Sequence, residues 1–416
     1  MVRTMGKVDE LIRQLETGDP NERYQAASAL GQLGDPKALP ALLQALDDED
    51  PNVHIAAARA VGKIGDLNAI QNLFDAYERR TVRFAEPIFE AIGEILGRTD
   101  PDDKNRAVFS RIVDRLIQFV QQDDSFDTIV RAKAAAEALG KTRDPKAIPI
   151  LLERLRKRGS FEMAKAAARA LRHFDDPQVI QALTEVAANR NIDEKLRETA
   201  VQSLGDIGNP EVVDTLIPIL EEGSGKPYPT LGDTLRKETA RALGRIGNPK
   251  AIEPLIRTLQ KEWDWSKFGL RQAIIDALGN FRDPQLTDAL VGALSSDYHT
   301  AAAAAELLKK LRDRRAVEPL IRIVEDDGNK GVYSDHRRRF AAQVLGVLGD
   351  PRAIPALVNA LHDDDEDIRK AARESLLAFV PTHPDAILRL PPDDRHRLGR
   401  LIQDAQREEL SHEICK

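Results

Sequence analysis

The chain has 416 residues, of which 31% are charged and 42% hydrophobic, and its formal net charge is −7. A chain of this length exceeds one ordinary core, which predicts two or three domains or one elongated array. The composition excludes a disordered chain, and the negative charge disfavours a dedicated nucleic-acid binder, because such proteins normally carry a basic face. The one cysteine, Cys415, excludes a disulfide scaffold and any cysteine-based metal centre within one chain.

The N-terminal segment MVRTMGKVDELIRQL lacks the apolar run of a signal peptide. No later stretch approaches about 18 consecutive apolar residues, the length that predicts a membrane-spanning helix. We therefore expect no membrane insertion and a cytoplasmic location, which the single cysteine also suits. Residues 1–18 are expected to form an N-terminal capping helix for the repeats that follow.

From residue 23 onward the chain repeats itself. The segment 23–46, RYQAASALGQLGDPKALPALLQAL, returns at 236–259 as RKETARALGRIGNPKAIEPLIRTL and at 338–361 as RRFAAQVLGVLGDPRAIPALVNAL. Weaker copies lie between these, and the early ones are evenly spaced, since Gly31, Gly62 and Gly93 are 31 residues apart. In one copy Arg314 stands where the others carry proline. Self-similarity with such a period is typical of repeat architectures.

Each copy predicts two antiparallel helices. Apolar residues follow helical spacing in both halves of the first copy, at Ala26, Ala27, Leu30 and Leu33 and then at Leu39, Leu42, Leu43 and Leu46. Between them Gly34 suits the left-handed residue that ends a helix, Asp35 supplies an N-cap, and Pro36 suits the first helical position. We expect Leu42 and its counterpart Leu357 to be core residues.

One such pair cannot bury its apolar stripe alone, whereas stacked neighbours do. We therefore expect an all-α fold, an α-solenoid in the form of a right-handed superhelix of about ten to eleven antiparallel helix pairs, over residues 1–380. Prolines at 381, 384, 391 and 392 then interrupt the period. Residues 381–416 are expected to hold this break, a C-terminal capping helix from about residue 394, and a mobile tail.

The pattern Arg-x-x-Ala-Ala-x-x-Leu-Gly-x-Leu-Gly-Asp-Pro-x-Ala-Ile-Pro-x-Leu resembles HEAT-like repeats of the type found in phycocyanobilin lyases, over nearly the whole chain. The resemblance implies the fold but no single function, because proteins with such repeats include binding scaffolds, assembly factors and a few enzymes. In the similar phycobilin lyases the reactive thiol belongs to the acceptor protein. Deoxyhypusine hydroxylases need paired His-Glu motifs, whereas His-Glu occurs here once, at 412–413, which excludes that activity.

Two recurrent features are interpreted as structural. Gly-x-x-Gly recurs at one place in the repeat, at the end of the first helix, where glycine terminates helices. An arginine stands seven residues before the repeat's leucine in several copies. We expect these guanidinium groups to pair with turn aspartates of neighbouring repeats, with an anion-binding ladder as the alternative; the residues are Arg23, Arg197, Arg236, Arg271, Arg338 and Arg369. The histidines lack metal-ligand spacing, so no metal site is predicted.

Aromatic residues gather in four consecutive connections of the second half, at Tyr228, Trp263, Trp265, Phe268, Tyr298 and Tyr333. Each connection joins the second helix of one pair to the first helix of the next, so a regular solenoid places all four along one edge. Insertions in solenoid repeats map to one face, often the binding face. We expect these rings, with Lys267 and Arg338, to form a binding edge; the alternative is that each ring fills a gap in its own loop.

The extended repeat surface, without a complete catalytic constellation, predicts a non-catalytic binding scaffold or assembly factor with a protein partner, no nucleic acid and no cofactor. The resemblance implies an alternative, a phycobilin lyase or chromophore-binding chaperone whose ligand is a linear tetrapyrrole. Rings and basic side chains suit a flat bilin with two propionates, and Asp264, between the two tryptophans, is the candidate proton donor. A change in the visible absorbance of a bilin on mixing would separate the two functions.

Overall fold

The structure is a computed structural model that describes residues 2–79, 85–122, 126–157, 160–222, 231–261, 268–326, 332–379, 382–400 and 403. The side chains at 2–5, 126–127, 231–233, 268 and 332–335 lie outside this description. Every regular element in the described ranges is helical, which confirms the predicted all-α fold. None of these helices combines the length and the apolar character that crossing a membrane requires.

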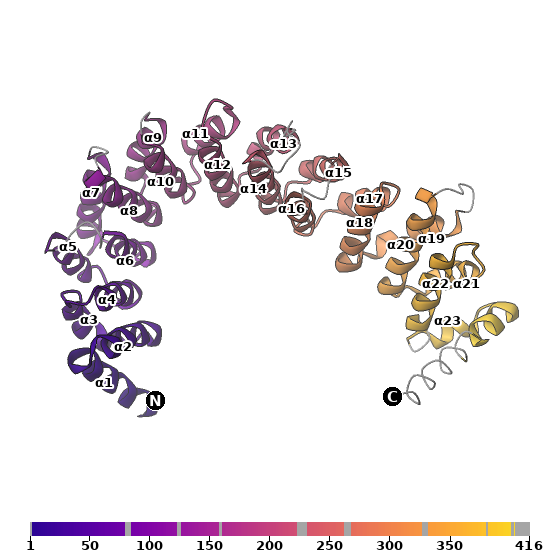
Figure 1. Ribbon diagram of the computed structural model, residues 1–416, viewed down its shortest axis with the longest axis horizontal. Coiled ribbons are helices and arrows are strands. Elements are labelled where there is room, and N and C mark those ends of the chain that lie inside the picture. Colours follow the sequence, from indigo (N-terminus) through magenta and orange to yellow (C-terminus); the bar gives the residue numbers. More distant parts are fainter. Residues whose placement is uncertain are drawn as a thin grey trace. The chain divides into compact units, whose positions relative to one another are not determined.

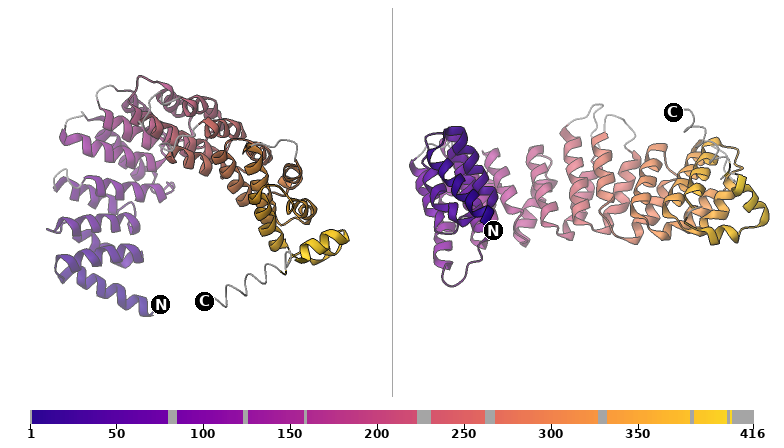
Figure 2. Two further views of the ribbon diagram at one scale, coloured as in Figure 1. Left: turned by 45° about the vertical axis from the view of Figure 1, so that its right-hand side comes forward. Right: turned by 90° about the horizontal axis from the view of Figure 1, so that it is seen from below.

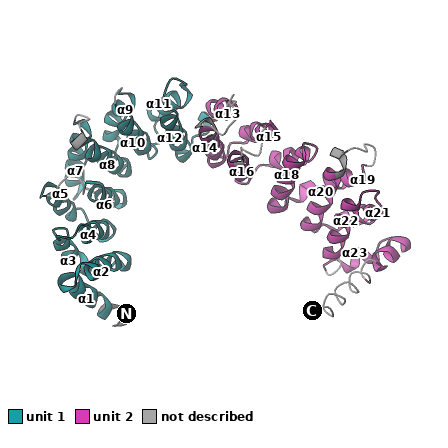
Figure 3. Cartoon of the chain, viewed as in Figure 1, with its two compact units in different colours: residues 1–212 teal, residues 213–416 magenta. Residues whose placement is uncertain are grey.

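The chain divides into two compact units, residues 1–212 and 213–416 (Figure 3). Within each unit the first helices of the pairs lie side by side in one layer, and the second helices form another layer (Figures 1 and 2). This arrangement, in which each pair packs mainly on the pairs before and after it, is the α-solenoid expected from the repeats.

In the first unit, α1 (Val2–Thr17) packs on α2 and α3 at the N-terminal end. The first helices are α2 (Pro20–Leu33), α4 (Pro51–Ile64), α6 (Ala85–Arg98), α8 (Phe126–Thr142), α10 (Phe161–Leu171) and α12 (Glu194–Ile207). The second helices are α3 (Leu39–Ala45), α5 (Ala69–Arg79), α7 (Arg106–Gln121), α9 (Ile148–Arg156) and α11 (Pro177–Ala188).

The second unit continues the pattern. Its first helices are α14 (Leu231–Ile246), α16 (Phe268–Leu278), α18 (Tyr298–Leu311), α20 (Val332–Leu348) and α22 (Glu366–Phe379). Its second helices are α13 (Val213–Glu221), α15 (Ile252–Lys261), α17 (Pro284–Ala293), α19 (Val317–Glu325) and α21 (Ile354–Ala360), followed by the short α23 (Pro384–Leu388). The described residues thus hold eleven first and ten second helices, in agreement with the predicted ten to eleven pairs. Residues 392–400 are helical as well.

The turns follow the local chemistry that the sequence predicts. Asp19 and Glu22 form a capping box, in which each side chain accepts a backbone N–H of the other residue at 2.9 Å. Asp35 accepts from the backbone of Lys37 at 3.0 Å. Before six of the described second helices, the Asp-Pro or Asn-Pro step, or its Asp-Arg counterpart, opens a 3₁₀ turn, and α-helical geometry begins three residues later; Pro177 and Pro284 instead open α11 and α17 directly. These turns are η1 (Pro36–Ala38), η3 (Pro145–Ala147), η4 (Pro210–Val212), η5 (Pro249–Ala251), η7 (Arg314–Ala316) and η8 (Pro351–Ala353).

The two glycines of Gly-x-x-Gly have different roles. In four motifs the second one ends the first helix in the left-handed conformation, with φ of 70° at Gly34 and 65° at Gly349, whereas Gly65 has an extended conformation with φ of −70°. The first one lies where two first helices cross. A Cβ on Gly31 would lie 2.8 Å from Cβ of Ala60, and one on Gly244 would lie 2.6 Å from Cα of Ala277. Close packing of the first-helix layer therefore requires the first glycine, and helix termination accounts only for the second.

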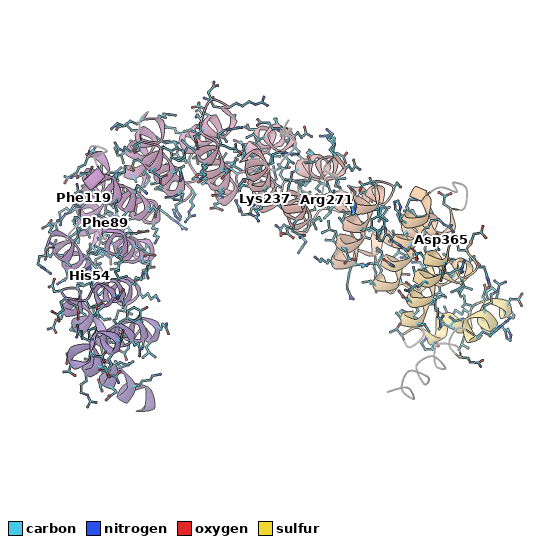
Figure 4. The ribbon with its side chains drawn as sticks, viewed as in Figure 1. His54, Phe89, Phe119, Lys237, Arg271 and Asp365 are labelled. Atoms are coloured by element: carbon cyan, nitrogen blue, oxygen red, sulfur yellow. The ribbon has the colours of Figure 1, made fainter. Side chains whose placement is uncertain are left out.

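The core consists mainly of Ala, Leu, Ile and Val, and Leu42 and Leu357 are fully buried, as predicted. The first unit adds an unexpected ring cluster in which Phe89 packs edge-on against Phe119, with centroids 5.2 Å apart (Figure 4). Phe74 and Tyr77 complete this cluster. The Arg115 guanidinium lies 4.1 Å from the Phe74 ring centroid. Rings in this chain therefore also fill the core.

The repeated arginines act mainly on the backbone. Each donates to a carbonyl oxygen that precedes its own helix: Arg23 to Gly18, Arg197 to Ala187, Arg236 to Leu220, Arg271 to Leu259, Arg338 to Val324 and Arg369 to Asp363. Arg23 and Arg338 also pair with a turn aspartate, Asp48 and Asp363 respectively. His54 occupies the same repeat position and contacts the Leu46 carbonyl oxygen (Figure 4). The expected Asp pairing is thus only part of a more general capping of helix ends.

Candidate partner-binding edge

The connections from a second helix to the next first helix form what we call the loop edge of the second unit: α13–α14, α15–α16, α17–α18, α19–α20 and α21–α22. Of the predicted site residues, Tyr228, Trp263, Trp265 and Lys267 lie outside the described residues, as do the side chains of Phe268 and Tyr333. Tyr298 and Arg338 are described.

Hydrogen bonds join neighbouring connections of the loop edge. Gln260, at the end of α15, donates from Nε2 to Oγ of Ser296 at 2.9 Å, which links this helix end to the α17–α18 connection. His336 Nε2 on α20 lies 3.2 Å from the Ser296 carbonyl oxygen. Arg338 on the same helix pairs with Asp363 in the α21–α22 connection. The described ends of four successive connections therefore adjoin, as the repeat geometry predicts.

Tyr298 is an exposed ring on the described part of this edge, with 48% of its surface accessible. It is the first residue of α18, after Asp297, whose carboxylate accepts from the backbone of His299 at 3.0 Å and of Thr300 at 3.2 Å. The N-cap thus sets the start of α18 and places the ring at the rim. The ring centroid lies 5.5 Å from that of Phe340.

Two further groups on α20 lie beside Tyr298. The His336 ring lies 5.8 Å away and nearly perpendicular, at 80°. The Arg339 guanidinium carbon lies 5.4 Å from the Tyr298 centroid and 4.8 Å from that of Phe340. Arg339 also pairs with Asp367 at 2.7 Å, and this ion pair holds the cation beside the rings. We call Tyr298, His336, Arg339 and Phe340 the Tyr298 cluster.

Of the two basic residues singled out from the sequence, Lys267 lies outside the described residues, and Arg338 does not face the Tyr298 ring. Arg338 has only 13% of its side chain exposed, because its guanidinium is bound to the Val324 carbonyl oxygen and to Asp363. Arg339, one residue later, faces the rings. The missed residues carried a signal: His336, Arg339 and Phe340 are at i, i+3 and i+4, which puts them on one face of a helix.

The Tyr298 cluster has the chemistry of a binding anchor. A half-exposed tyrosine supported from below by a buried Phe340 offers a rigid apolar surface with a hydroxyl at its tip, and the adjacent guanidinium adds a cation. Tyrosine and arginine are the residue types that dominate the energetics of protein interfaces. Within the described ranges, no group of three or more His, Cys, Asp or Glu side chains is arranged to hold a metal ion.

The loop edge also carries carboxylates. Its described part includes Asp297, Glu325, Asp326 and the run 363–367, and Asp365 in this run caps α22 by accepting from Asp367 N at 2.8 Å and Ile368 N at 3.0 Å (Figure 4). The Tyr298 cluster thus places an aromatic ring and a guanidinium next to carboxylates of the same edge.

Comparison with known proteins supports the repeat assignment. HEAT repeats match at residues 8–86, 111–204, 151–228, 190–267, 268–335 and 333–390. Comparison with curated protein sequences gave no match.

Solved structures of other proteins are also similar to this chain. A structure of Kap95p with RanGDP is 12% identical, with a TM-score of 0.54, over 91% of this chain and 56% of that chain. An engineered protein is 19% identical, with a TM-score of 0.34, over 90% of this chain and 98% of that one. The CpcE–CpcF complex of phycocyanin lyase from Nostoc sp. PCC7120 is 20% identical, with a TM-score of 0.31, over 70% of this chain and 94% of that chain.

The Kap95p match supports the solenoid fold and says nothing about function, because its sequence identity is low. The repeat matches cover most of the sequence and include both compact units. The chain belongs to the HEAT-repeat family.

Proposed function

We propose that this protein is a non-catalytic scaffold that binds a protein partner along the loop edge of its second unit. The observation that carries the proposal is the Tyr298 cluster, an exposed ring with an adjacent guanidinium at the rim of a repeat whose other rings are mostly buried. A repeat's own core gains little from a ring with 48% of its surface in water, whereas an interface gains an anchor.

The other predicted rings extend this proposal. Trp263 and Trp265 lie in the α15–α16 connection, outside the described residues. The end of α15 is hydrogen-bonded to the α17–α18 connection that carries Tyr298. The proposed interface therefore runs from residues 262–267 past Tyr298, with Tyr228, Phe268 and Tyr333 as further contributors.

The test is site-specific photo-crosslinking in the native cell. A crosslinking residue at position 298 should capture a discrete protein, and the same residue at position 322, exposed on α19, should not. With the captured protein in hand, Trp263→Ala combined with Trp265→Ala, and separately Tyr298→Ala, should each weaken binding by at least about tenfold, roughly 1.4 kcal/mol, with circular dichroism unchanged. Equal capture at both positions would refute the proposal. If the tryptophan variant unfolds the flanking repeats, those rings are local packing.

The alternative ligand, a linear tetrapyrrole, is tested by adding a bilin to the purified chain. The scaffold proposal expects unchanged visible absorbance. A narrowed, shifted band that disappears in the Trp263→Ala, Trp265→Ala variant would favour the chromophore-binding function instead.

A further inference from the structure

The second unit has a basic edge opposite the loop edge. The turns inside three consecutive helix pairs, residues 279–283, 309–315 and 349–352, make up what we call the turn edge. They carry seven cations and three aspartates, although the whole chain has a net charge of −7. The cations are Arg282, Lys309, Lys310, Arg312, Arg314, Arg315 and Arg352.

Contacts between neighbouring pairs make the turn edge continuous. Thr287 on α17 donates to the Asp313 carboxylate at 2.6 Å, which ties the first pair to the second turn. The third turn adjoins the second pair, because η8 packs against α19. One turn per repeat is thus aligned along the edge.

The aspartates of the turn edge neutralise only part of its charge. Asp313 is paired with Arg315 at 2.6 Å, and Asp350 is paired with Arg352 at 2.9 Å. Lys310, Arg312 and Arg314 are exposed and form no ion pair with any described residue. These three side chains remain available to a carboxylate from outside the unit.

The central turn differs from the repeat pattern at the positions of two of these cations, Arg312 and Arg314. Residues 349–352 read Gly-Asp-Pro-Arg, and residues 312–315 read Arg-Asp-Arg-Arg. The backbone is nevertheless the same, since φ is 65° at Gly349 and 51° at Arg312. Glycine suits that conformation far better than arginine, and proline suits the position of Arg314 at the start of η7. Both changes act against local stability.

Helix electrostatics account for only part of this charge. Lys309 and Lys310 lie in the last turn of α18, where cations interact favourably with the helix dipole. Arg314 and Arg315 instead open the next helical segment, where the dipole disfavours positive charge. The ion pair with Asp313 accounts for Arg315, so it is the presence of Arg314 that requires another reason.

We propose that the turn edge binds an extended acidic segment of a protein partner. Packed helices lie about 8–10 Å apart, so carboxylates on every third residue of an extended chain, at about 3.3 Å per residue, meet successive turns. The three interleaved aspartates suit discrete carboxylates better than the continuous charge of a nucleic acid. The proposal stands apart from the loop edge, which lies at the other ends of the helices.

The probe is a fluorescein-labelled oligoglutamate of about twelve residues, titrated with the full-length protein and followed by fluorescence anisotropy. Binding is expected at low ionic strength. It should be lost near 1 M salt, because the screening length falls from about 10 Å at 0.1 M to about 3 Å.

The decisive variant restores the repeat's own turn, with Arg312→Gly and Arg314→Pro together. The change removes a left-handed arginine, and no described hydrogen bond uses the Arg314 backbone N–H, so Tm should equal or exceed that of the unmodified protein. Affinity for oligoglutamate should fall by at least about tenfold. The control is Lys370→Glu, at an exposed position of α22 near the loop edge. It changes the net charge by the same two units and should leave the affinity for oligoglutamate unchanged.

Three outcomes would overturn the proposal. One is that oligoglutamate fails to bind at low salt. Another is that the restored turn and Lys370→Glu weaken binding equally, which would reduce the effect to net charge. The last is that an oligothymidylate of equal charge binds more tightly and also loses its affinity when the turn is restored, which would make the turn edge a nucleic-acid surface. None of these outcomes bears on the Tyr298 cluster, so the two proposals fail separately.

Discussion

Equivalent turn positions hold different residues from one repeat to the next, and these residues differ in backbone strain and in charge. Among the residues that the structure describes, the left-handed position that ends the first helix is glycine in four repeats and arginine in two, Arg143 and Arg312, with φ of 53° and 51°. A side chain with a Cβ is strained there by about 1–2 kcal/mol. The two arginines therefore mark turns in which something other than backbone preference selected the residue.

Arg143→Gly should raise the free energy of unfolding by about 1 kcal/mol, because glycine adopts this φ without strain. Urea denaturation of the two proteins measures the difference. Arg143→Ala is the matched control, since alanine keeps the Cβ and should give no gain. A loss of stability on Arg143→Gly would show that the arginine side chain is bound in a way that outweighs the strain.

Asp313 links stability to pH. The hydrogen bond from Arg315, with a further one from Thr287, holds its pKa at about 2, below the usual value of about 3.9. A depressed folded-state pKa stabilises the protein above the unfolded value, and this contribution is lost as the pH falls through the folded value. Asp313→Asn should therefore cost about 1 kcal/mol at pH 7, a figure reduced for the partial exposure of the carboxylate. The difference should shrink between about pH 4 and pH 2; denaturation at several pH values measures it, and a constant difference would contradict the charge-based explanation.

At the scale of helices, contact between first helices depends on residues without a Cβ. A Cβ on Gly244 of α14 would lie 2.6 Å from the backbone of Ala277 on α16, so the two helices would have to move apart. Because the same crossing recurs between neighbouring first helices of each unit, a residue with a Cβ at one of these positions disturbs the layer of first helices as well as its own helix pair.

Gly244→Ala should destabilise the protein by about 1–3 kcal/mol, the usual cost of overpacking. Gly292→Ala on α17 is the control. A Cβ there meets nothing within 4 Å, so the change should add about 0.5–1 kcal/mol through helix propensity. The same sign for both variants in thermal denaturation would contradict the packing described.

Leu42 and Leu357 test the packing of the second helices. Both are fully buried and hold equivalent places in two copies of the repeat, one in each unit. Leu42→Ala and Leu357→Ala should each cost about 2–5 kcal/mol. Unchanged unfolding in either variant would show that this helix does not pack as described.

At the scale of the whole molecule, charge is divided between surfaces. The chain has a net charge of −7, with acidic residues along the loop edge and cations along the turn edge of the second unit. Association with partners is therefore expected to depend on which edge they approach and on ionic strength.

Binding to duplex DNA should be weak and salt-sensitive, because few phosphates can be contacted without also meeting carboxylates. A filter-binding titration at about 0.15 M salt measures it. Submicromolar binding that survives higher salt would contradict this expectation.

The repeat architecture could be predicted from local signals alone. Asp-Pro steps, the Gly34 helix end, the capping box at Asp19 and the apolar spacing around Leu42 act within one or two helical turns, and the structure reproduces each of them. Family resemblance led to the same fold, and the HEAT-repeat match confirms it.

The local signals did not predict the features that depend on contacts between residues about one repeat apart. Gly31 looks like a helix terminator until Ala60 of the next repeat is placed against it. Arg338 and Arg339 are adjacent in sequence, yet one is bound to Asp363 and the other faces Tyr298, because successive residues on a helix point about 100° apart. Which arginine serves the core and which serves the surface was decided only when neighbouring pairs were stacked.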